Sequence, residues 1–227
     1  MALNAFILNC TLKKSPKVSH TEALINKCVD LFKPLGVECE VLRPVDYNIP
    51  FGVSSNEGHG DEWPAILDKA TRCDIIIIGT PIWFGVRSSV AQLVIERLDG
   101  TYEEGDPKTG QFPLYGKVGG CIVTGNEDGA HDAAATTLFN FSHLGCTIPP
   151  NADCYWVGEA GPGPSYIDAG GDKHMYTNKT ARYMTSNLAF FAKLLKDNPI
   201  PTNLKQLTAD AEKASQDECA TRHGVGA

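Results

Sequence analysis

Apolar and polar residues follow one another along this chain in a pattern that predicts strands and helices in turn. The clearest segment is 74–85, where four isoleucines at positions 75–78 precede Gly-Thr-Pro-Ile-Trp-Phe-Gly. A run that is β-branched and apolar on both faces is typical of a central strand of a parallel sheet, because helices cover such a strand on both sides. We expect Pro81 to end the ladder of this strand, because proline has no amide N–H to donate.

Four further segments read as strands, at residues 4–9, 37–43, 118–124 and 151–157. Apolar residues recur at helical spacing between them, which predicts helices over residues 21–35, 61–72, 88–99, 129–145 and 172–196. Strands that alternate with helices predict an α/β fold in which a doubly wound, five-stranded parallel sheet lies between two helical layers. We expect residues 1–197 to form this domain, and the polar residues 198–227 to form a docked extension that frays.

Composition narrows the classes of partner and site. A net charge of −7 over 227 residues argues against nucleic acid or an anionic membrane as the main partner. The chain has no apolar run near the roughly 18–20 residues that span a bilayer. Its start lacks the basic region of a signal peptide, so we expect a cytoplasmic protein. The eight cysteines form no Cys-x-x-Cys pair and are expected to be reduced, mostly core thiols, and we expect no metal site.

The loop after the first strand, residues 10–21, has the composition of a phosphate site. It carries four hydroxyls, three lysines and a histidine, with no acid and no glycine. A phosphate placed at the start of the following helix would bind free N–H groups at the positive end of the helix dipole. The candidates are Thr11, Lys13, Ser19, His20 and Thr21. A solvated basic loop with an ordinary N-cap is an equally open interpretation. The missing glycines argue against a dinucleotide-binding fold.

A second loop follows the isoleucine strand and places two aromatic side chains at its carboxyl end. Ligands of open parallel sheets bind at that edge, and the aromatic pair suits a flat, conjugated ligand. The candidates in this loop are Pro81, Ile82, Trp83, Phe84 and Gly85.

A third loop follows the strand at 118–124. Its glycines allow the backbone to approach a planar ring, and its N–H groups could match the edge of a pyrimidine-like ring. The candidates are Thr124, Gly125, Asn126 and Gly129. A plain turn that leads into a helix N-cap is the alternative interpretation.

Residues 80–85 (Thr-Pro-Ile-Trp-Phe-Gly), then Ser88 and the segment Ile-Glu-Arg-Leu at 95–98, resemble the signature of one family. This is the family of flavodoxin-like NAD(P)H-dependent FMN reductases and the related multimeric flavodoxin-type quinone oxidoreductases. The resemblance covers roughly residues 4–157 and implies a flavodoxin-like three-layer sandwich with strand order 2-1-3-4-5. The chain departs from the family at Gln92, where a lysine is usual.

The resemblance also implies a function. FMN would be held by the candidate residues of the three loops and would pass electrons from NAD(P)H to a quinone, a flavin or a similar small-molecule acceptor. The chemistry would belong to flavin N5, so no side chain is expected to be catalytic. Relatives form homodimers or homotetramers, and we expect the same here. An FMN-binding electron carrier without direct nicotinamide oxidation is the alternative, and a non-catalytic module on the same fold is a third possibility.

Several residues carry narrower expectations. The carboxylates of Glu127 and Asp128 should point outward, because a negative charge would oppose an anionic reduced flavin. Arg87 is the candidate for the 2′-phosphate of NADPH. His174 and Tyr176 could reach over the flavin of a neighbouring subunit.

Overall fold

The computed structural model describes residues 2–161 and 163–223, with side chains described as far as Ser215. Five parallel strands form a sheet in the order β2-β1-β3-β5-β6, and a short sixth strand, β4, pairs antiparallel with the end of β3. The strands are β1 (Leu3–Asn9), β2 (Val37–Leu42), β3 (Ile75–Trp83), β4 (Val86–Arg87), β5 (Val118–Gly125) and β6 (Asp153–Val157). If only the five parallel strands are numbered in chain order, the sheet order becomes 2-1-3-4-5, which confirms the expected flavodoxin-like topology.

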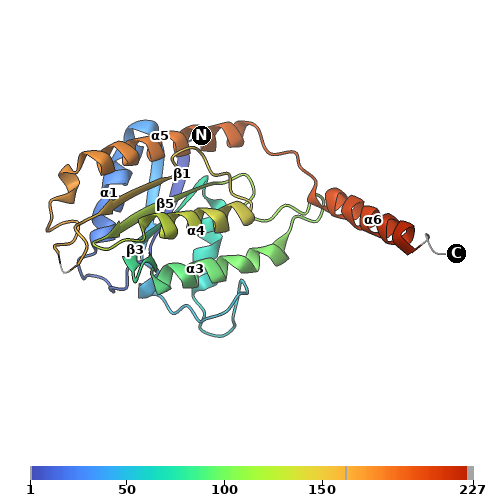
Figure 1. Cartoon of the computed structure of the whole chain (residues 1–227), viewed down its shortest axis with the longest axis horizontal. Coiled ribbons are helices and arrows are strands. Elements are labelled where there is room, and N and C mark those ends of the chain that lie inside the picture. The colour runs from blue at the N-terminus through green and yellow to red at the C-terminus, as the bar shows by residue number, and fades with distance from the viewer. Residues whose placement is uncertain (1, 162, 224–227) are drawn as a thin grey trace.

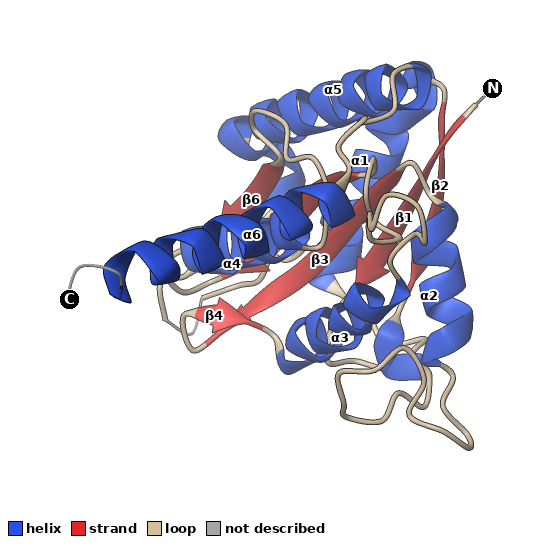
Figure 2. Ribbon diagram, turned by 90° about the vertical axis from the view of Figure 1, so that its right-hand side faces the viewer, coloured by secondary structure: helices blue, strands red, loops and turns tan. Residues whose placement is uncertain are grey.

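Helices cover both faces of the sheet, as Figures 1 and 2 show. One apolar core lies between the sheet and the pair α1 and α5, and a second lies between the sheet and α2, α3 and α4. The helices are α1 (His20–Phe32), α2 (Trp63–Arg72), α3 (Ser89–Asp99), α4 (Ala130–His143), α5 (Met175–Asp197) and α6 (Leu204–His223). Short 3₁₀ turns occupy Lys33–Leu35, Pro44–Asp46, Gly100–Glu104 and Gly171–Lys173.

The isoleucine strand lies at the centre of the sheet, where each of its four isoleucines is fully buried. The expectation that Pro81 ends the ladder is wrong, because Pro81 lies opposite Thr124 and β3 continues to Trp83. Strand β1 pairs with β3 only as far as Gly79, so Pro81 lies where the edge of β3 is no longer paired with β1. A residue without an N–H is tolerated at such an edge. The extra length of β3 carries the aromatic loop beyond the rest of the sheet.

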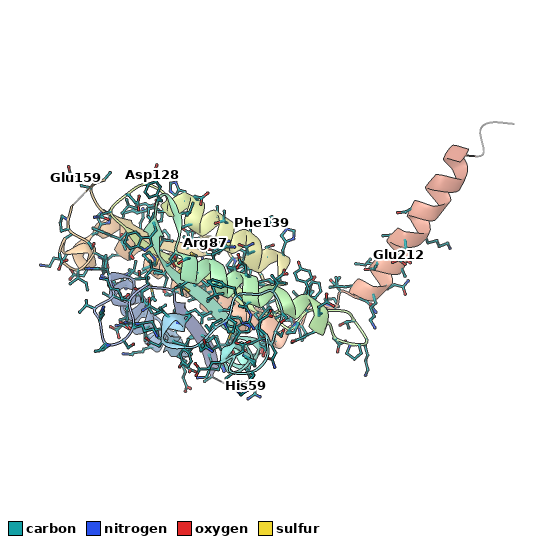
Figure 3. All side chains as sticks on the ribbon, turned by 90° about the horizontal axis from the view of Figure 1, so that it is seen from below. His59, Arg87, Asp128, Phe139, Glu159 and Glu212 are labelled. Atoms are coloured by element: carbon teal, nitrogen blue, oxygen red, sulfur yellow. The ribbon has the colours of Figure 1, made fainter. Side chains whose placement is uncertain are left out.

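The chain after α5 differs from the expected polar tail. Residues 204–223 form α6, which stands away from the rest of the molecule (Figures 1 and 3). The segment 105–111 binds the linker that leads to it. Gln111 Nε2 donates to the carbonyls of Ile200 (2.9 Å) and Thr202 (2.8 Å), and the N–H of Leu204 donates to the carbonyl of Thr109 (2.7 Å).

Three further findings concern the residues that the structure describes. No helix among them is long and apolar enough to cross a membrane. No cluster of three or more potential metal ligands occurs in that part of the chain. The seven cysteines with described side chains are free thiols.

Candidate functional site

The loops that follow β1, β3 and β5 meet at one edge of the sheet and border a cavity of about 180 Å³. The sequence candidates that line it are Thr11, Lys13, His20, Thr21, Pro81, Ile82, Trp83, Thr124, Gly125 and Asn126. The candidates that do not line it are Ser19, Phe84, Gly85 and Gly129. Four other residues complete the wall: Glu127, Trp156, Ser165 and Tyr166. The structure therefore brings the three predicted loops together and adds a fourth segment.

The first loop leads into α1 through an ordinary helix cap. Ser19 has an extended backbone, and its hydroxyl accepts the N–H of Glu22 at 3.1 Å. Ser19 is buried and does not line the cavity. Thr21 lies two residues further on, in the cavity wall, and its hydroxyl is 2.7 Å from the hydroxyl of Thr124. This hydrogen bond joins the first loop to the third.

Arg43, which follows β2, supports the first loop from behind, a role that the sequence analysis missed. Its Nη1 donates to the carbonyls of Lys13 (3.1 Å) and Lys17 (2.9 Å), and its Nη2 forms an ion pair with Glu22. Arg43 is buried, so its charge holds the loop and does not face solvent. A basic residue at the end of a partly exposed strand was the available signal, but its partners lie far away in sequence.

His20, which lines the cavity, also contacts the segment after β6. Its Nδ1 accepts the N–H of Ile167 at 3.2 Å, and its Nε2 lies 3.9 Å from a carboxylate oxygen of Asp168. Burial and the nearby Lys13 lower the pKa of His20 from its ordinary 6.5, and Asp168 offsets part of this effect. His20 therefore ties the segment after β6 to the start of α1, while Lys13 supplies the cation at this end of the cavity.

The second loop exposes its aromatic residues at the mouth of the cavity. Trp83 is 54% exposed, and Phe84 is 99% exposed with a left-handed φ of 54°. The N–H of Phe84 donates to Glu127 Oε1 at 3.0 Å. Glu127 is thus half-buried in the cavity wall, and the expectation that it points outward is wrong. The reason is local, since the turn at Phe84 leaves an amide N–H that needs an acceptor.

Asp128 is exposed, as expected, and lies at the outer edge of the molecule (Figure 3). Its carboxylate accepts the N–H of Gly129 at 2.8 Å. Gly129 has a φ of 127°, and a Cβ added there would lie 2.2 Å from the carbonyl oxygen of Gly85. The second and third loops therefore touch backbone to backbone at a position that only glycine fits.

Arg87 lies away from the cavity and is held between α3 and α4. Its guanidinium donates to Gln92 Oε1 (2.6 and 2.9 Å) and to Asn140 Oδ1 (2.6 Å). The structure therefore does not support Arg87 as the ligand of a 2′-phosphate. Gln92, which stands where the family usually has lysine, serves as the main acceptor for Arg87.

The fourth segment, between β6 and α5, covers the cavity from the side of α1. Asn126 Nδ2 donates to the carbonyl of Gly163 at 2.8 Å, which fastens this segment to the third loop. The rings of Trp156 and Tyr166 pack edge to face with centroids 5.6 Å apart. Burial raises the pKa of Tyr166 to about 12, and its hydroxyl has no hydrogen-bond partner among the described residues. Glycine and proline marked this segment as a loop in the sequence, but nothing showed that it folds over the site.

His174 and Tyr176 do not line the cavity of their own chain. The Nδ1 of His174 lies 2.9 Å from the hydroxyl of Thr177 and caps α5. The ring of Tyr176 packs on that of Tyr155, with centroids 5.8 Å apart.

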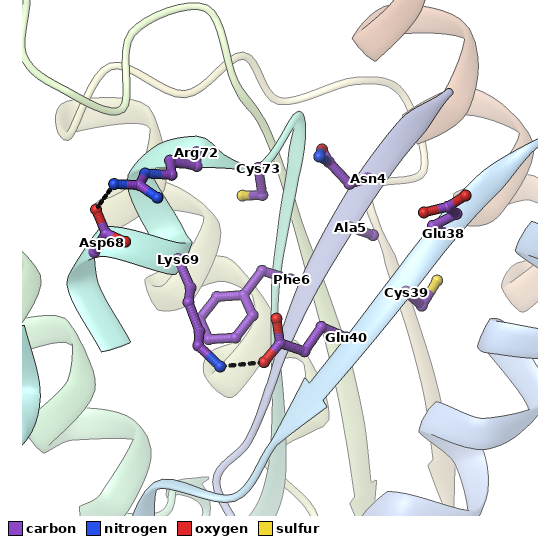
Figure 4. A pocket seen from close by; sticks show the side chains of 10 residues that line it. All are labelled: Asn4, Ala5, Phe6, Glu38, Cys39, Glu40, Asp68, Lys69, Arg72 and Cys73. Carbon is purple, nitrogen blue, oxygen red and sulfur yellow. Dashed lines mark hydrogen bonds and ion pairs between the residues drawn. The ribbon is translucent and has the colours of Figure 1, made fainter. Parts of the chain in front are cut away.

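A larger hollow of about 480 Å³ lies near the amino ends of β1 and β2 (Figure 4). Four of its charged side chains are already paired, Lys69 with Glu40 and Arg72 with Asp68. Parallel sheets bind their ligands at the opposite, carboxyl edge. The smaller cavity among the loops is therefore the better candidate for the functional site.

Comparison with known proteins identifies the family. Residues 4–160 match the family described as NADPH-dependent FMN reductase. The chain is 42% identical to 8-demethyl-8-aminoriboflavin-5′-phosphate synthase of Streptomyces davaonensis, over 99% of this chain and 91% of that protein. A crystal structure of RosB with the bound intermediate 8-demethyl-8-formylriboflavin-5′-phosphate is similar at a TM-score of 0.89 and 41% identity, over 94% of this chain and 88% of that chain.

A flavodoxin from the domain Archaea is similar at a TM-score of 0.53 and 11% identity, over 84% of this chain and 99% of that chain, which shows the fold alone. The family match covers more than half of the chain and agrees with the loops described above. The chain belongs to the NADPH-dependent FMN reductase family and is a flavin-dependent oxidoreductase with a flavodoxin-like fold.

Proposed function

We propose that this chain binds FMN in the cavity among its loops, oxidises NAD(P)H and passes the electrons to a small-molecule acceptor such as a quinone or a flavin. One observation carries the proposal. The first loop lines the cavity with hydroxyl and basic side chains, and the second and third loops line it with an exposed tryptophan and the backbone at Gly125. This division matches a ligand with a phosphate at one end and a flat ring at the other.

The phosphate end is formed by Thr11, Lys13 and Thr21 together with the first N–H groups of α1. Hydroxyl and amide groups can donate to phosphate oxygens, and the helix dipole and the lysine supply positive charge. Arg43 keeps this loop in place through its two backbone carbonyl contacts. These residues therefore suit a phosphate monoester.

The ring end is more open. The cavity of about 180 Å³ is smaller than the roughly 300 Å³ at which small-molecule pockets usually begin. It would therefore enclose the phosphate and sugar-alcohol part, while the ring would lie at the mouth against Trp83. Backbone groups at Gly125 and Asn126 would border the pyrimidine edge. FMN bound in this way would supply hydride transfer at its ring nitrogen N5.

The chain's own residues would bind and orient the ring rather than move protons. Trp83 would hold one face, and its solvent exposure leaves room for a second planar molecule nearby. Glu127 fixes the turn at Phe84 through the hydrogen bond of 3.0 Å and so sets the shape of the cavity mouth. We also propose that residues 1–197 are the FMN-binding domain and that the chain acts as a homodimer or homotetramer.

The comparisons favour a second candidate function, in which a riboflavin phosphate is the substrate rather than the cofactor. The relative from Streptomyces davaonensis carries the name of a synthase of 8-demethyl-8-aminoriboflavin-5′-phosphate, and it matches 99% of this chain. The same cavity would then hold the riboflavin phosphate that is changed during the reaction.

One experiment separates these functions. The purified protein is incubated with FMN and with NADH or NADPH without oxygen while the flavin absorbance is followed. In a parallel incubation it is mixed with FMN, oxygen as the oxidant and an amino acid as the nitrogen donor, and the flavin is then analysed by mass spectrometry. Bleaching by a nicotinamide, reversal by a quinone and an unchanged flavin mass would support the oxidoreductase. A flavin of altered mass would support the second candidate. Reduction only by a partner reductase would identify an electron carrier.

A pair of lysine variants tests the site itself. Lys13→Met should weaken FMN binding about 10-fold but leave riboflavin binding unchanged, because a charge-assisted bond to phosphate is worth about 1.5 kcal/mol or more. Lys14→Met is the matched control, because Lys14 is the next residue in the loop and does not line the cavity. Equal FMN affinities in the two variants would place the phosphate elsewhere.

A further inference from the structure

The hydroxyl of Tyr166 is a buried polar group at the cavity wall. Tyr166 is 2% exposed, and its hydroxyl makes no hydrogen bond to any residue that the structure describes. Other buried side-chain atoms without such a partner belong to Asn9, Arg43, Ser55, Trp63 and Thr137. None of these residues lines the cavity among the loops, whereas Tyr166 does. An unpartnered hydroxyl is costly inside a protein, so its place beside the cavity indicates a ligand that uses it.

The ring of Tyr166 is fixed by contacts that do not involve its hydroxyl. The ring packs edge to face on Trp156, with centroids 5.6 Å apart, and the backbone carbonyl of Tyr166 accepts the N–H of Gly171 at 2.8 Å. A Cβ at position 171 would clash with the ring, so glycine is needed there for the close approach. The fold therefore positions the ring and leaves its hydroxyl available to a ligand.

The contacts around Tyr166 place it near the hydroxyls that join the first and third loops. The next residue, Ile167, donates its N–H to the first residue of α1 at 3.2 Å, close to the phosphate end. Trp156 lies opposite Thr124 in the sheet, and the hydroxyl of Thr124 is 2.7 Å from that of Thr21. Tyr166 thus adds a third hydroxyl to a wall that already carries those of Thr21 and Thr124.

A wall of this kind suits a ligand chain that carries hydroxyl groups itself. Burial raises the pKa of Tyr166 to about 12, so the phenol keeps its proton at neutral pH and can donate it. A riboflavin phosphate has a hydroxylated chain between its ring and its phosphate, and each of those hydroxyls can accept. The ring is expected at the open mouth beside the exposed Trp83, whereas Tyr166 is buried. The enclosed chain is therefore the part of the ligand that matches Tyr166.

We propose that the hydroxyl of Tyr166 donates a hydrogen bond to a hydroxyl of the sugar-alcohol chain of a bound riboflavin phosphate, which makes Tyr166 a specificity-determining residue. The inference rests on the proposed function, because it needs that ligand in the cavity. It holds whether the riboflavin phosphate is cofactor or substrate. Residue 166 lies beyond residues 4–160, which match the family. The contact therefore belongs to the fourth segment of this chain and not to the three loops within the family match.

The proposal gives Tyr166→Phe two opposite effects. The substitution removes the hydroxyl and keeps the ring that packs on Trp156. Without a ligand it removes a buried, unpartnered group, so the variant should melt at the same temperature as the parent protein or higher. With FMN it removes a hydrogen bond, so FMN should bind about 5-fold or more weakly. A hydroxyl with a purely structural role would not produce both effects.

A change in the ligand tests whether the contact is made to the chain. The probe is a synthetic FMN analogue in which an alkyl chain of equal length, without hydroxyls, joins the ring to the phosphate. FMN and the analogue are each titrated into the parent protein and into Tyr166→Phe, and the flavin fluorescence is followed. The variant should lose affinity for FMN but bind the analogue as tightly as the parent protein does. Tyr183→Phe removes the hydroxyl of an exposed tyrosine on α5 and is the control, which should bind both ligands like the parent protein.

The other outcomes overturn the inference, each for a different reason. Equal losses for FMN and the analogue would assign the hydroxyl to the phosphate or the ring. An unchanged FMN affinity in Tyr166→Phe would show that the hydroxyl does not contact the ligand. A lower melting temperature of the ligand-free variant would show that the hydroxyl supports the fold. These three results leave the proposed function standing, whereas a parent protein that binds neither ligand would refute that function and this inference with it.

Discussion

The ion pair between Arg97 and Asp61 offers the sharpest prediction for stability. Both side chains are fully buried, and Arg97 Nη2 lies 2.6 Å from Asp61 Oδ2. The guanidinium also donates to the carbonyls of Ser54 and Pro50, each at 3.0 Å. It therefore binds the long loop before α2 to helix α3. We expect Arg97→Met to leave the buried Asp61 carboxylate without its cationic partner and two carbonyls without their donor.

The size of the loss follows from this burial. Removing one partner of a buried ion pair typically costs about 3–5 kcal/mol, because the other charge stays in the interior. For a chain of this length, 1 kcal/mol lowers the melting temperature by about 2–4 °C. The variant should thus melt about 6–20 °C lower by calorimetry. Arg72→Met breaks the exposed pair with Asp68 and should change the free energy of unfolding by less than about 1 kcal/mol.

The loss should also depend on pH. Burial alone would raise the pKa of Asp61, but hydrogen bonds from Arg97 and from the N–H groups of Glu57 and Trp63 hold it below the ordinary 3.8. A lowered carboxyl pKa stabilises the fold above the unfolded value and loses that effect as pH falls through the folded value. The difference between the parent protein and Arg97→Met should therefore shrink below about pH 4. A melting temperature equal to that of Arg72→Met at neutral pH would refute this reasoning.

Three further predictions concern the candidate site. Trp83→Ala should weaken FMN binding by about 1–3 kcal/mol, or roughly 5- to 150-fold, by fluorescence titration, since aromatic stacking on a ring has that value; an unchanged affinity would place the ring elsewhere. Because burial and Lys13 lower the pKa of His20, the unfolded chain takes up this proton first, so urea denaturation should show stability falling as pH drops below 6.5. His20→Asn should flatten that slope, and an unchanged slope would assign it to other groups. Gly129→Ala places a methyl 2.2 Å from the carbonyl oxygen of Gly85, so it should lower both the melting temperature and FMN affinity, and normal values for both would contradict the contact between the loops.

Local pattern alone was sufficient for most of the fold. Four adjacent isoleucines indicate a buried central strand, and the alternation of strands with helices indicates a doubly wound sheet. The ends of elements were less predictable. Pro81 remains inside β3 because the pairing of β3 with β1 ends at Gly79. Pro34 lies in a 3₁₀ turn that follows the end of α1. Such details depend on neighbours that a single segment does not show.

The convergence of the three loops was also readable, because parallel strands end at the same edge. The residues that hold these loops in place could not be predicted from the sequence. Arg43 binds carbonyls 26 and 30 residues away, and Glu127 accepts an N–H from a loop 43 residues earlier. Periodicity reports whether a residue is buried, but not which distant group satisfies its hydrogen bonds.

The amino-acid sequence by itself determined the class of fold, the order of its elements and the chemistry carried by each loop, since these depend on short-range spacing and composition. Only the tertiary structure decided which side chains share the cavity, that a fourth segment covers it, and that α6 projects from the body. Those outcomes depend on contacts between residues far apart in the chain, whose geometry exists only once the sheet and its helices have packed.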